Sequence, residues 1–518
     1  MKQRRAILSI ARTREGEIDE RYKVKRSKRS RTDLHRRQPA CQKFSPEFNR
    51  SNPASRRISD ILRCKGLWGG IVGNGLVSQV WHDTESTLRL GLKSTVAKNA
   101  ASLYIIQFAQ YILPLITVPY LVRVLEPSGY GLVAFGQSFI AYFTILADYG
   151  FAFSATRKIS LEREDILAVS RTASHVWAAK ALMAAIGFIM LLMLTSLVPK
   201  LHESSALLLI LYGSVIGSVL FPTWLFQGME RMVAISGIHL AMQLFILIGV
   251  FAFIHRPEDY LIYAKLMSTG SIFSGLVGVF IAIYMFRIKP VLPSGRGILE
   301  TLQEGWVLFL SMASVSLYTA GNAFILGLLA SPEAVGYYSA AEKIVKAMLG
   351  LIGPITQAAY PRFAKMVAES KETALKWGQK MLFMMGALGL GLSLSIFLVS
   401  PLIVRIILGP QYEPSIIVMQ ILSVLMFAIC VNNVLGVQLM LTLRHDRAFT
   451  LVVLAAGILN IILAIILAPI WKESGMAVAV VSSEVFIVIV EFIYLQHRYS
   501  FMDNCRKTLR GIVHERAP

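Results

Sequence analysis

The sequence predicts an all-α membrane protein of about 12 transmembrane helices in two six-helix lobes, related as a parallel repeat. The first observation is composition: 55% of the 518 residues are hydrophobic and only 16% are charged, against about 25% in a typical soluble domain. Mean hydropathy is +0.58. A soluble protein of this length cannot bury so much apolar surface, so lipid must cover part of it. The second observation is a repeated apolar segment, and the third is a likeness between the two halves.

Residues 1–93 differ from the rest and are excluded from the predicted fold. They are basic and polar, and they lack the apolar core of a secretory signal peptide, so we do not expect cleavage. Three interpretations stay open. The segment is a disordered cytoplasmic extension, an electrostatic attachment to anionic lipid, or not natural coding sequence, because no methionine lies between Met1 and Met183.

From about residue 99 the chain alternates some 20 apolar residues with short polar breaks, and about 20 helical residues cross a hydrocarbon core of about 30 Å. The apolar residues do not alternate with polar ones, as they would in a β-barrel. We predict one lobe over 94–300, a second over 301–500 and a basic cytoplasmic tail over 501–518. The predicted spans lie near 100–124, 131–152, 174–198, 205–226, 232–254, 260–286, 304–330, 334–358, 380–400, 413–442, 448–469 and 475–496.

The breaks alternate between rich and poor in lysine and arginine, and this bias keeps its sign along the whole chain. Positive charge gathers in cytoplasmic loops, so the rich breaks are predicted to be cytoplasmic, as are both termini. We expect the chain to lie in the bacterial inner membrane. The rich breaks hold Arg157, Lys158, Arg163, Arg171, Arg231, Arg287, Lys289, Arg296, Arg362, Lys365, Lys371, Lys376, Arg444 and Arg447, and the poor ones hold Arg123, Lys200, Arg256, Arg405 and Lys472.

The two halves resemble each other in sequence. YLVRVLEPSGYGLVAFGQSF (120–139) is echoed by FILGLLASPEAVGYYSAAEKI (324–344), with Gly129-Tyr130 matched to Gly336-Tyr337 in short external turns. Six spans per half give both halves the same orientation, which is a parallel repeat about an axis along the membrane normal. Two such lobes leave a cleft that rocking opens to each side in turn, an architecture typical of transport.

The run from Pro114 to Ser160 resembles the oligosaccharide flippase (Wzx-type polysaccharide biosynthesis protein) family, of the multidrug/oligosaccharidyl-lipid/polysaccharide exporter superfamily. The matching pieces are PYLVRVLEPSGYG, DYGF, SATRKIS, QGMER and AEKI, and the likeness extends over about residues 95–500. The resemblance implies twelve helices in two lobes and, as substrate, an undecaprenyl-diphosphate-linked sugar repeat unit used for O-antigen, capsule or exopolysaccharide. It also implies membrane lipids as partners, with a polysaccharide polymerase and a chain-length regulator as further candidates.

Three charged residues inside the eighth span are the clearest site candidates, because charge within a membrane usually faces a partner or a wet cavity. Lys343 and Lys346 lie roughly 14 and 18 Å below Ala334 and share a helix face. Glu342 can reach Lys346 at i,i+4, yet one acid cannot neutralise two lysines. We expect a cationic cavity wall that attracts diphosphate or acidic sugars, with local Glu–Lys pairing as the alternative.

Six further charges complete the candidate set. Lys180 and Lys265 are cavity candidates, with snorkelling to the interface slightly favoured for each. Arg123 either binds phosphate or anchors its helix. The acids Asp148, Glu304 and Glu484 are candidates for ion coupling or charge pairing, and for Asp148 we favour pairing with Arg157 and Lys158.

Several classes of protein are excluded by what the sequence lacks. It has no P-loop, G-x-S-x-G or H-E-x-x-H motif, and Cys41, Cys64, Cys430 and Cys505 form no metal or disulfide pattern. No cofactor is expected. The net charge of +21 fits cytoplasmic loops better than nucleic-acid binding. Alternatives to a flippase are a drug/cation exporter, a peptidoglycan-precursor exporter or, less favoured, a membrane polymerase or glycosyltransferase, which usually carries a large catalytic loop.

Overall fold

The computed structural model describes residues 95–501, with gaps at residues 290 and 351, and in this part of the chain short connections join helices, without a strand. Eight helical segments within it are long and apolar enough to cross a membrane. The predictions for the extension over 1–93 and for the tail beyond Phe501 lie outside the described residues. The chain is an all-helical, multi-pass membrane protein.

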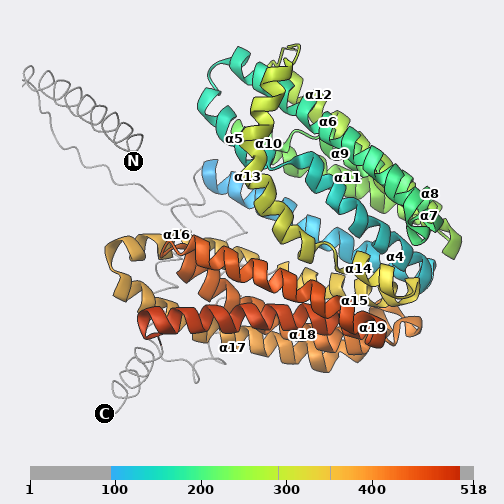
Figure 1. The fold of residues 1–518 in the computed structure, drawn as a ribbon, viewed down its shortest axis with the longest axis vertical. Coiled ribbons are helices and arrows are strands. Elements are labelled where there is room, and N and C mark those ends of the chain that lie inside the picture. The colour runs from blue at the N-terminus through green and yellow to red at the C-terminus, as the bar shows by residue number, and fades with distance from the viewer. Residues whose placement is uncertain (1–94, 290, 351, 502–518) are drawn as a thin grey trace, which may run out of the picture. The chain divides into compact units, whose positions relative to one another are not determined.

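Helices of the first half run alongside one another in Figure 1, where α4 packs against α6, α9 and α11, and α12 packs against α9 and α11. The bounds are α4 Thr95–Asp148, α5 Phe151–Glu162, α6 Ile166–Leu197, α7 Pro199–Glu203, α8 Ser205–Leu211, α9 Gly213–Leu220, α10 Thr223–Gly228, α11 Met232–Phe253, η1 Pro257–Asp259 and α12 Tyr260–Phe286.

Helices of the second half are joined chiefly through α18, which packs against α15, α17 and α19. Their bounds are α13 Gly295–Thr319, α14 Asn322–Leu329, α15 Pro332–Gly350, α16 Gly353–Glu369, α17 Lys371–Ile403, η2 Val404–Leu408, η3 Pro410–Tyr412, α18 Ser415–Asn432, η4 Asn433–Leu441 and α19 Asp446–Tyr499. Two of them, η2 and η4, are π-helical.

Local chemistry explains where several helices begin. The carboxylate of Asp165 accepts from the backbone N–H groups of Leu167 and Ala168 and so caps α6. Ser294 caps α13 in the same way by accepting from Gly297 N–H, and Ser370 caps α17. Each cap satisfies backbone donors that would otherwise lack a partner in the first helical turn.

The helices α4 and α19 have 54 residues each, and each is interrupted by one residue with a non-helical backbone conformation. Unbroken, each would be roughly 80 Å long, far beyond a hydrocarbon core of about 30 Å. Glu126 (φ 58°, ψ 172°) interrupts α4, and Lys472 (φ 48°, ψ −125°) interrupts α19. Glu126 precedes Pro127, and a residue before proline is driven out of the α conformation. Both breaks fall between predicted spans, so each long helix has room for two crossings, while the total of twelve stays a prediction.

Hydrogen bonds and ion pairs show which polar connections of the first half lie together at the same end of its helices. Arg163 pairs with Glu230 at 2.8 Å, and the backbone N–H of Lys289 donates to Ser170 at 3.0 Å. These lysine- and arginine-rich breaks form what we call the basic end. At the opposite end, Lys200 Nζ donates to the carbonyl oxygens of Leu328 (3.2 Å) and Ala330 (2.8 Å).

A reciprocal close contact joins α4 to α15 at this opposite end. Gly131 lies against the carbonyl oxygen of Pro332, and Gly336 lies against the carbonyl oxygen of Pro127, so closely that a Cβ on either glycine would clash with backbone. The proline–glycine spacing is the same in both helices. In this contact Gly131 and Gly336 have matching positions, whereas the sequence likeness between the halves matches Gly129 with Gly336.

Candidate functional site

Four cavities within the described residues share lining residues and are therefore adjacent. The largest, the central cavity (about 470 Å³), lies among α4, α9, α11, α12 and α15. It shares Gln137 and Lys343 with the lysine cavity (about 300 Å³). It shares Met242 and Ser271 with the aspartate cavity (about 270 Å³). The fourth, the side cavity (about 200 Å³), shares Met242, Ile246, Met267 and Lys343 with it.

The lysine cavity lies where α4 of the first half meets α14 and α15 of the second, and its lining includes Tyr130, Gln137, Ser138, Asn322, Ser339, Glu342, Lys343 and Lys346. Lys346 Nζ lies 3.0 Å from Glu342 Oε1, which also accepts a hydrogen bond from the Tyr338 hydroxyl at 2.9 Å. The i,i+4 contact expected from sequence is therefore present.

Lys343 stands apart from this pair. It lines the lysine, central and side cavities. In the part of the chain that the structure describes, Lys343 makes neither an ion pair nor a side-chain hydrogen bond. One carboxylate thus faces two ammonium groups, which leaves the wall of the lysine cavity with net positive charge. Such a wall attracts an anionic group more strongly where water is scarce than at a wet surface.

The aspartate cavity lies nearer the basic end and is built by the first half alone. Helices α4, α5, α6, α9, α10, α11 and α12 all contribute to its lining, which includes Asp148, Lys180, Ser218, Phe221, Trp224, His239 and Ser274. Its aromatic side is fixed by packing: the Trp224 ring meets Trp177 edge to face at 5.5 Å, and Phe221 lies 4.7 Å from the His239 ring.

Lys180 and Asp148 form the ion pair of this cavity. Lys180 Nζ lies 2.8 Å from Asp148 Oδ1 and donates to the Ser218 carbonyl oxygen at 2.7 Å. The lysine side chain is 3% exposed and the aspartate 43% exposed. Two expectations are therefore wrong. Lys180 does not snorkel, since its ammonium is buried and bonded, and Asp148 does not pair with Arg157 or Lys158, since packing of α4 on α6 brings Lys180 closer.

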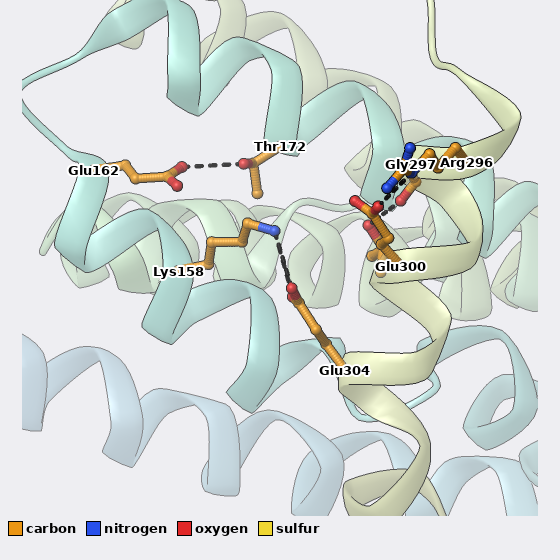
Figure 2. Close-up of polar contacts among 8 residues, drawn as sticks. Lys158, Glu162, Thr172, Arg296, Gly297, Glu300 and Glu304 are labelled. Carbon is orange, nitrogen blue, oxygen red and sulfur yellow. Dashed lines mark hydrogen bonds and ion pairs between the residues drawn. The ribbon is translucent and has the colours of Figure 1, made fainter. Parts of the chain in front are cut away.

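Lys158 instead pairs with Glu304, as Figure 2 shows. Lys158 Nζ on α5 lies 3.2 Å from Glu304 Oε1 on α13, and the two side chains are 37% and 50% exposed. The Glu162–Thr172 hydrogen bond (3.1 Å) beside it joins α5 to α6. Glu304 lines none of the four cavities and serves as a charge partner at the basic end.

Two of the expected cationic residues lie away from the four cavities. Lys265 is exposed on α12 and lines none of them. Arg123, also exposed, donates to the carbonyl oxygen of Ile406. Gln411 donates to the carbonyl oxygens of Val122 (3.1 Å) and Arg123 (3.2 Å). Arg123 therefore anchors the end of the first α4 segment against η2, which was one of the two roles considered for it.

A buried acid in the second half was missed by sequence reasoning. Glu491 on α19 is 0% exposed, and within the described residues neither of its carboxyl oxygens has a hydrogen-bond partner. A Cβ on Gly436 would lie 2.5 Å from Glu491 Oε1 and 3.0 Å from Asn432 Oδ1. Asn432 in turn donates to Glu484 Oε2 at 3.4 Å. The seven-residue spacing of Glu484 and Glu491, two turns on one helix face, was the signal available in the sequence.

Comparison with known proteins gives matches over most of the chain. The model of the family described as polysaccharide biosynthesis protein matches residues 96–367. Two curated relatives, from Escherichia coli (strain K12) and Shigella dysenteriae, are each named "Putative O-antigen transporter". They are 30% and 26% identical over 408 and 405 residues, covering 78% and 76% of this chain and 98% of each relative.

Solved structures with the same fold include two transporters. The lipid II flippase MurJ in an inward closed conformation has a TM-score of 0.59 at 14% identity, with 79% of this chain and 90% of that chain covered. An inward-facing multidrug resistance MATE family transporter of the MOP superfamily has a TM-score of 0.55 at 15% identity, with coverages of 78% and 99%. The family match and the two curated relatives identify a membrane transporter and not an enzyme, and the chain belongs to the polysaccharide biosynthesis protein family.

Proposed function

We propose that this protein is a flippase that moves an undecaprenyl-diphosphate-linked oligosaccharide repeat unit from the inner to the outer leaflet of the bacterial inner membrane. The product would serve synthesis of a surface polysaccharide such as O-antigen, capsule or exopolysaccharide. Support comes from the family, from relatives named as O-antigen transporters, and from adjoining cavities inside an apolar helical bundle.

The position of Lys343 is the observation that carries the proposal. It lines three adjoining cavities between helices of the two halves. Its ammonium and that of Lys346 face one carboxylate, so the lysine cavity suits a multiply charged anion. The diphosphate of a lipid-linked sugar is such a group. Lys343 is only partly exposed, so water screens its attraction for an anion less than at an open surface, while Lys346 lies on the more exposed side of the same cavity.

Alternating access fits the contacts that close the bundle at its ends. At the end opposite the basic one, Lys200, Gln411 and the reciprocal Gly131–Gly336 contact join the two halves. At the basic end the halves meet through the Lys158–Glu304 pair. Two lobes of six spans each, at 94–300 and 301–500, would rock relative to each other and open the two ends in turn. The lobes would be related as a parallel repeat, and both termini would be cytoplasmic.

Glu484 and Glu491 are our candidates for ion coupling. Glu491 lies against Gly436 in the π-helical η4 segment, and Glu484 accepts a hydrogen bond from Asn432, directly before that segment. Such π-helical turns occur frequently at functional sites. Transient association with a polysaccharide polymerase and a chain-length regulator would hand the flipped unit to polymer growth.

The double variant Lys343→Ala/Lys346→Ala tests the proposed diphosphate site. We expect surface polysaccharide to fall at least tenfold, because two charge-assisted contacts to the substrate are lost, each about 1.5–3 kcal/mol. The measurement is immunoblotting of extracted polysaccharide in a strain that lacks the chromosomal gene. Membrane insertion, followed by a fused fluorescent reporter, should not change.

Lys265→Ala is the matched control, since this lysine is exposed and lies outside the four cavities. It should leave polysaccharide near the wild-type amount. Wild-type polysaccharide in the double variant, at equal protein, would remove the substrate-site assignment.

A further inference from the structure

We propose that the aspartate cavity is a saccharide subsite that holds the glycan end of the substrate by neutral hydrogen bonding and aromatic contact, while the lysine cavity holds the diphosphate. This inference rests on the proposed function and assigns the two ends of one substrate to two different cavities. It concerns Asp148, Lys180, Ser218 and Trp224, which act at a place separate from Lys343 and Lys346.

Charge separates the two cavities. The wall of the lysine cavity has one carboxylate against two ammonium groups and is net positive. In the aspartate cavity Lys180 and Asp148 are the charged pair and neutralise each other at 2.8 Å. A cavity without net charge offers an anion or a cation no net attraction. Drawing Asp148 away to a cationic ligand would leave the buried ammonium of Lys180 without its ion partner, which costs stability. The group that suits it has many hydroxyls and no net charge.

The polar groups of the aspartate cavity are arranged to leave an acceptor open. Lys180 Nζ and the Ser218 hydroxyl both bond to Asp148 Oδ1, at 2.8 and 3.3 Å. Among the described residues Asp148 Oδ2 receives no hydrogen bond. Its carboxylate is therefore held in one orientation by two donors, with the second oxygen available in a side chain that is 43% exposed. Oriented acceptors of this kind bind hydroxyl donors with little loss of side-chain entropy.

Aromatic and hydroxyl side chains supply the rest of a sugar site. Phe221 and Trp224 line one part of the cavity, and Ser271 and Ser274 line another. Sugar rings present apolar C–H faces and polar edges, so mixed walls of this type match both. The volume of about 270 Å³ corresponds to about nine water molecules at roughly 30 Å³ each, which is similar to the bulk of one sugar ring.

The path between the two cavities has the right order for one extended molecule. The aspartate cavity shares Met242 and Ser271 with the central cavity, which shares Lys343 with the lysine cavity. A substrate whose diphosphate meets Lys343 can therefore pass its first sugar through the central cavity toward Asp148, nearer the basic end. Because the basic end is predicted to be cytoplasmic, a glycan that enters from the cytoplasm would lie on the Asp148 side of the diphosphate.

Binding measurements on the full-length protein in nanodiscs separate the two subsites. One probe is inorganic pyrophosphate. The other is the free glycan released by mild acid from the lipid-linked oligosaccharide of cells that lack the gene. The variant is Asp148→Asn/Lys180→Met, which removes both charges together and keeps the cavity near its size. We expect about tenfold weaker glycan binding, the equivalent of one or two hydrogen bonds, and unchanged pyrophosphate binding.

Lys343→Ala/Lys346→Ala should give the opposite pattern. Glu372→Gln/Lys376→Met, which removes an exposed ion pair within α17 and outside the four cavities, should change neither. If the first double variant misfolds on gel filtration, Ser218→Ala, which removes only one bond to Asp148, takes its place with a smaller expected loss of about threefold. Wild-type glycan affinity in the folded variant overturns the subsite. Wild-type protein that binds pyrophosphate but no glycan also overturns it while leaving the proposed function standing. Failure of both probes, with normal polysaccharide in the deletion strain, overturns the proposed function itself.

Discussion

A single imidazole ties the start of α19 to its end. His445 Nε2 lies 2.7 Å from the Tyr499 hydroxyl, and Nδ1 lies 3.1 Å from the Tyr494 hydroxyl. Burial lowers the pKa of His445 from its ordinary value, and the nearby charges of Arg498 and Lys371 lower it further, against a smaller opposing effect of Asp446. The neutral ring is therefore the form that suits the folded protein at this turn.

This shift predicts a pH dependence of stability. A folded-state pKa below the unfolded value of about 6.5 means that the unfolded chain binds the proton first. The contribution of the neutral His445 ring to stability is therefore complete above about pH 6.5, and it is lost as the pH falls from there through the lower folded-state pKa. Between about pH 7.5 and about pH 5.5, the thermal unfolding temperature of the wild type should therefore fall further than that of His445→Gln. Parallel curves for the two proteins would contradict this account.

At the scale of the element, the contact of α4 with α15 depends on two glycines. The carbonyl oxygen of Pro332 occupies the place that a side chain at Gly131 would need. Gly131→Val should lower the unfolding temperature by the equivalent of about 1–3 kcal/mol or more, because helix backbones must move apart. The measurement is thermal unfolding in detergent, followed by native tryptophan fluorescence.

Gly391 in α17 is the matched control, since nothing lies within 4 Å of a Cβ placed there. Gly391→Ala should leave stability unchanged or raise it by up to about 1 kcal/mol, because alanine is the better helix former. Equal unfolding temperatures for Gly131→Val and the wild type would show that α4 and α15 do not hold each other as described.

Contacts that stay within one helix were open to prediction, and contacts between helices were not. Glu342 and Lys346 lie one turn apart on α15, so helical geometry alone brings them together. Asp148 and Lys180 lie on α4 and α6, and their pairing depends on how these helices pack. The spacing of Glu484 and Glu491 places both on one helix face, but the burial of Glu491 depends on the packing of η4 against α19 and could not be read from the sequence. Apolar length predicted the helices, while the single-residue breaks at Glu126 and Lys472 were visible only as gaps between spans.

At the scale of the whole molecule, closure of the basic end involves the Lys158–Glu304 pair between α5 and α13 (Figure 2). Both side chains are partly exposed, so the pair contributes at most about 1 kcal/mol. Lys158→Glu would replace attraction by repulsion, and Lys158→Glu/Glu304→Lys would restore attraction with the signs exchanged. We expect the single variant to spend more time open at this end.

Thiol labelling measures that opening. The native cysteines are removed, and a cysteine replaces Ser271, which lines both the aspartate and central cavities. A membrane-impermeant maleimide supplied to inverted vesicles then reports access to these cavities from the basic end. The labelling rate should rise about two- to fivefold in Lys158→Glu, as expected for a partly exposed pair, and return toward the starting rate in the exchanged double variant. A rate unaffected by either change would separate this ion pair from the motion.

The breaks at Glu126 and Lys472 also bear on how the chain enters the bilayer during synthesis. Each makes a hairpin whose two arms are joined by one residue with φ above zero, so both arms can leave the translocon together as a closed unit. Only the tip of each hairpin, where Glu126 or Lys472 lies, then has to be carried across the hydrocarbon core. Lengthening either tip with several charged residues would raise the work of threading it through, and we would expect the hairpin to stall before the rest of the bundle forms.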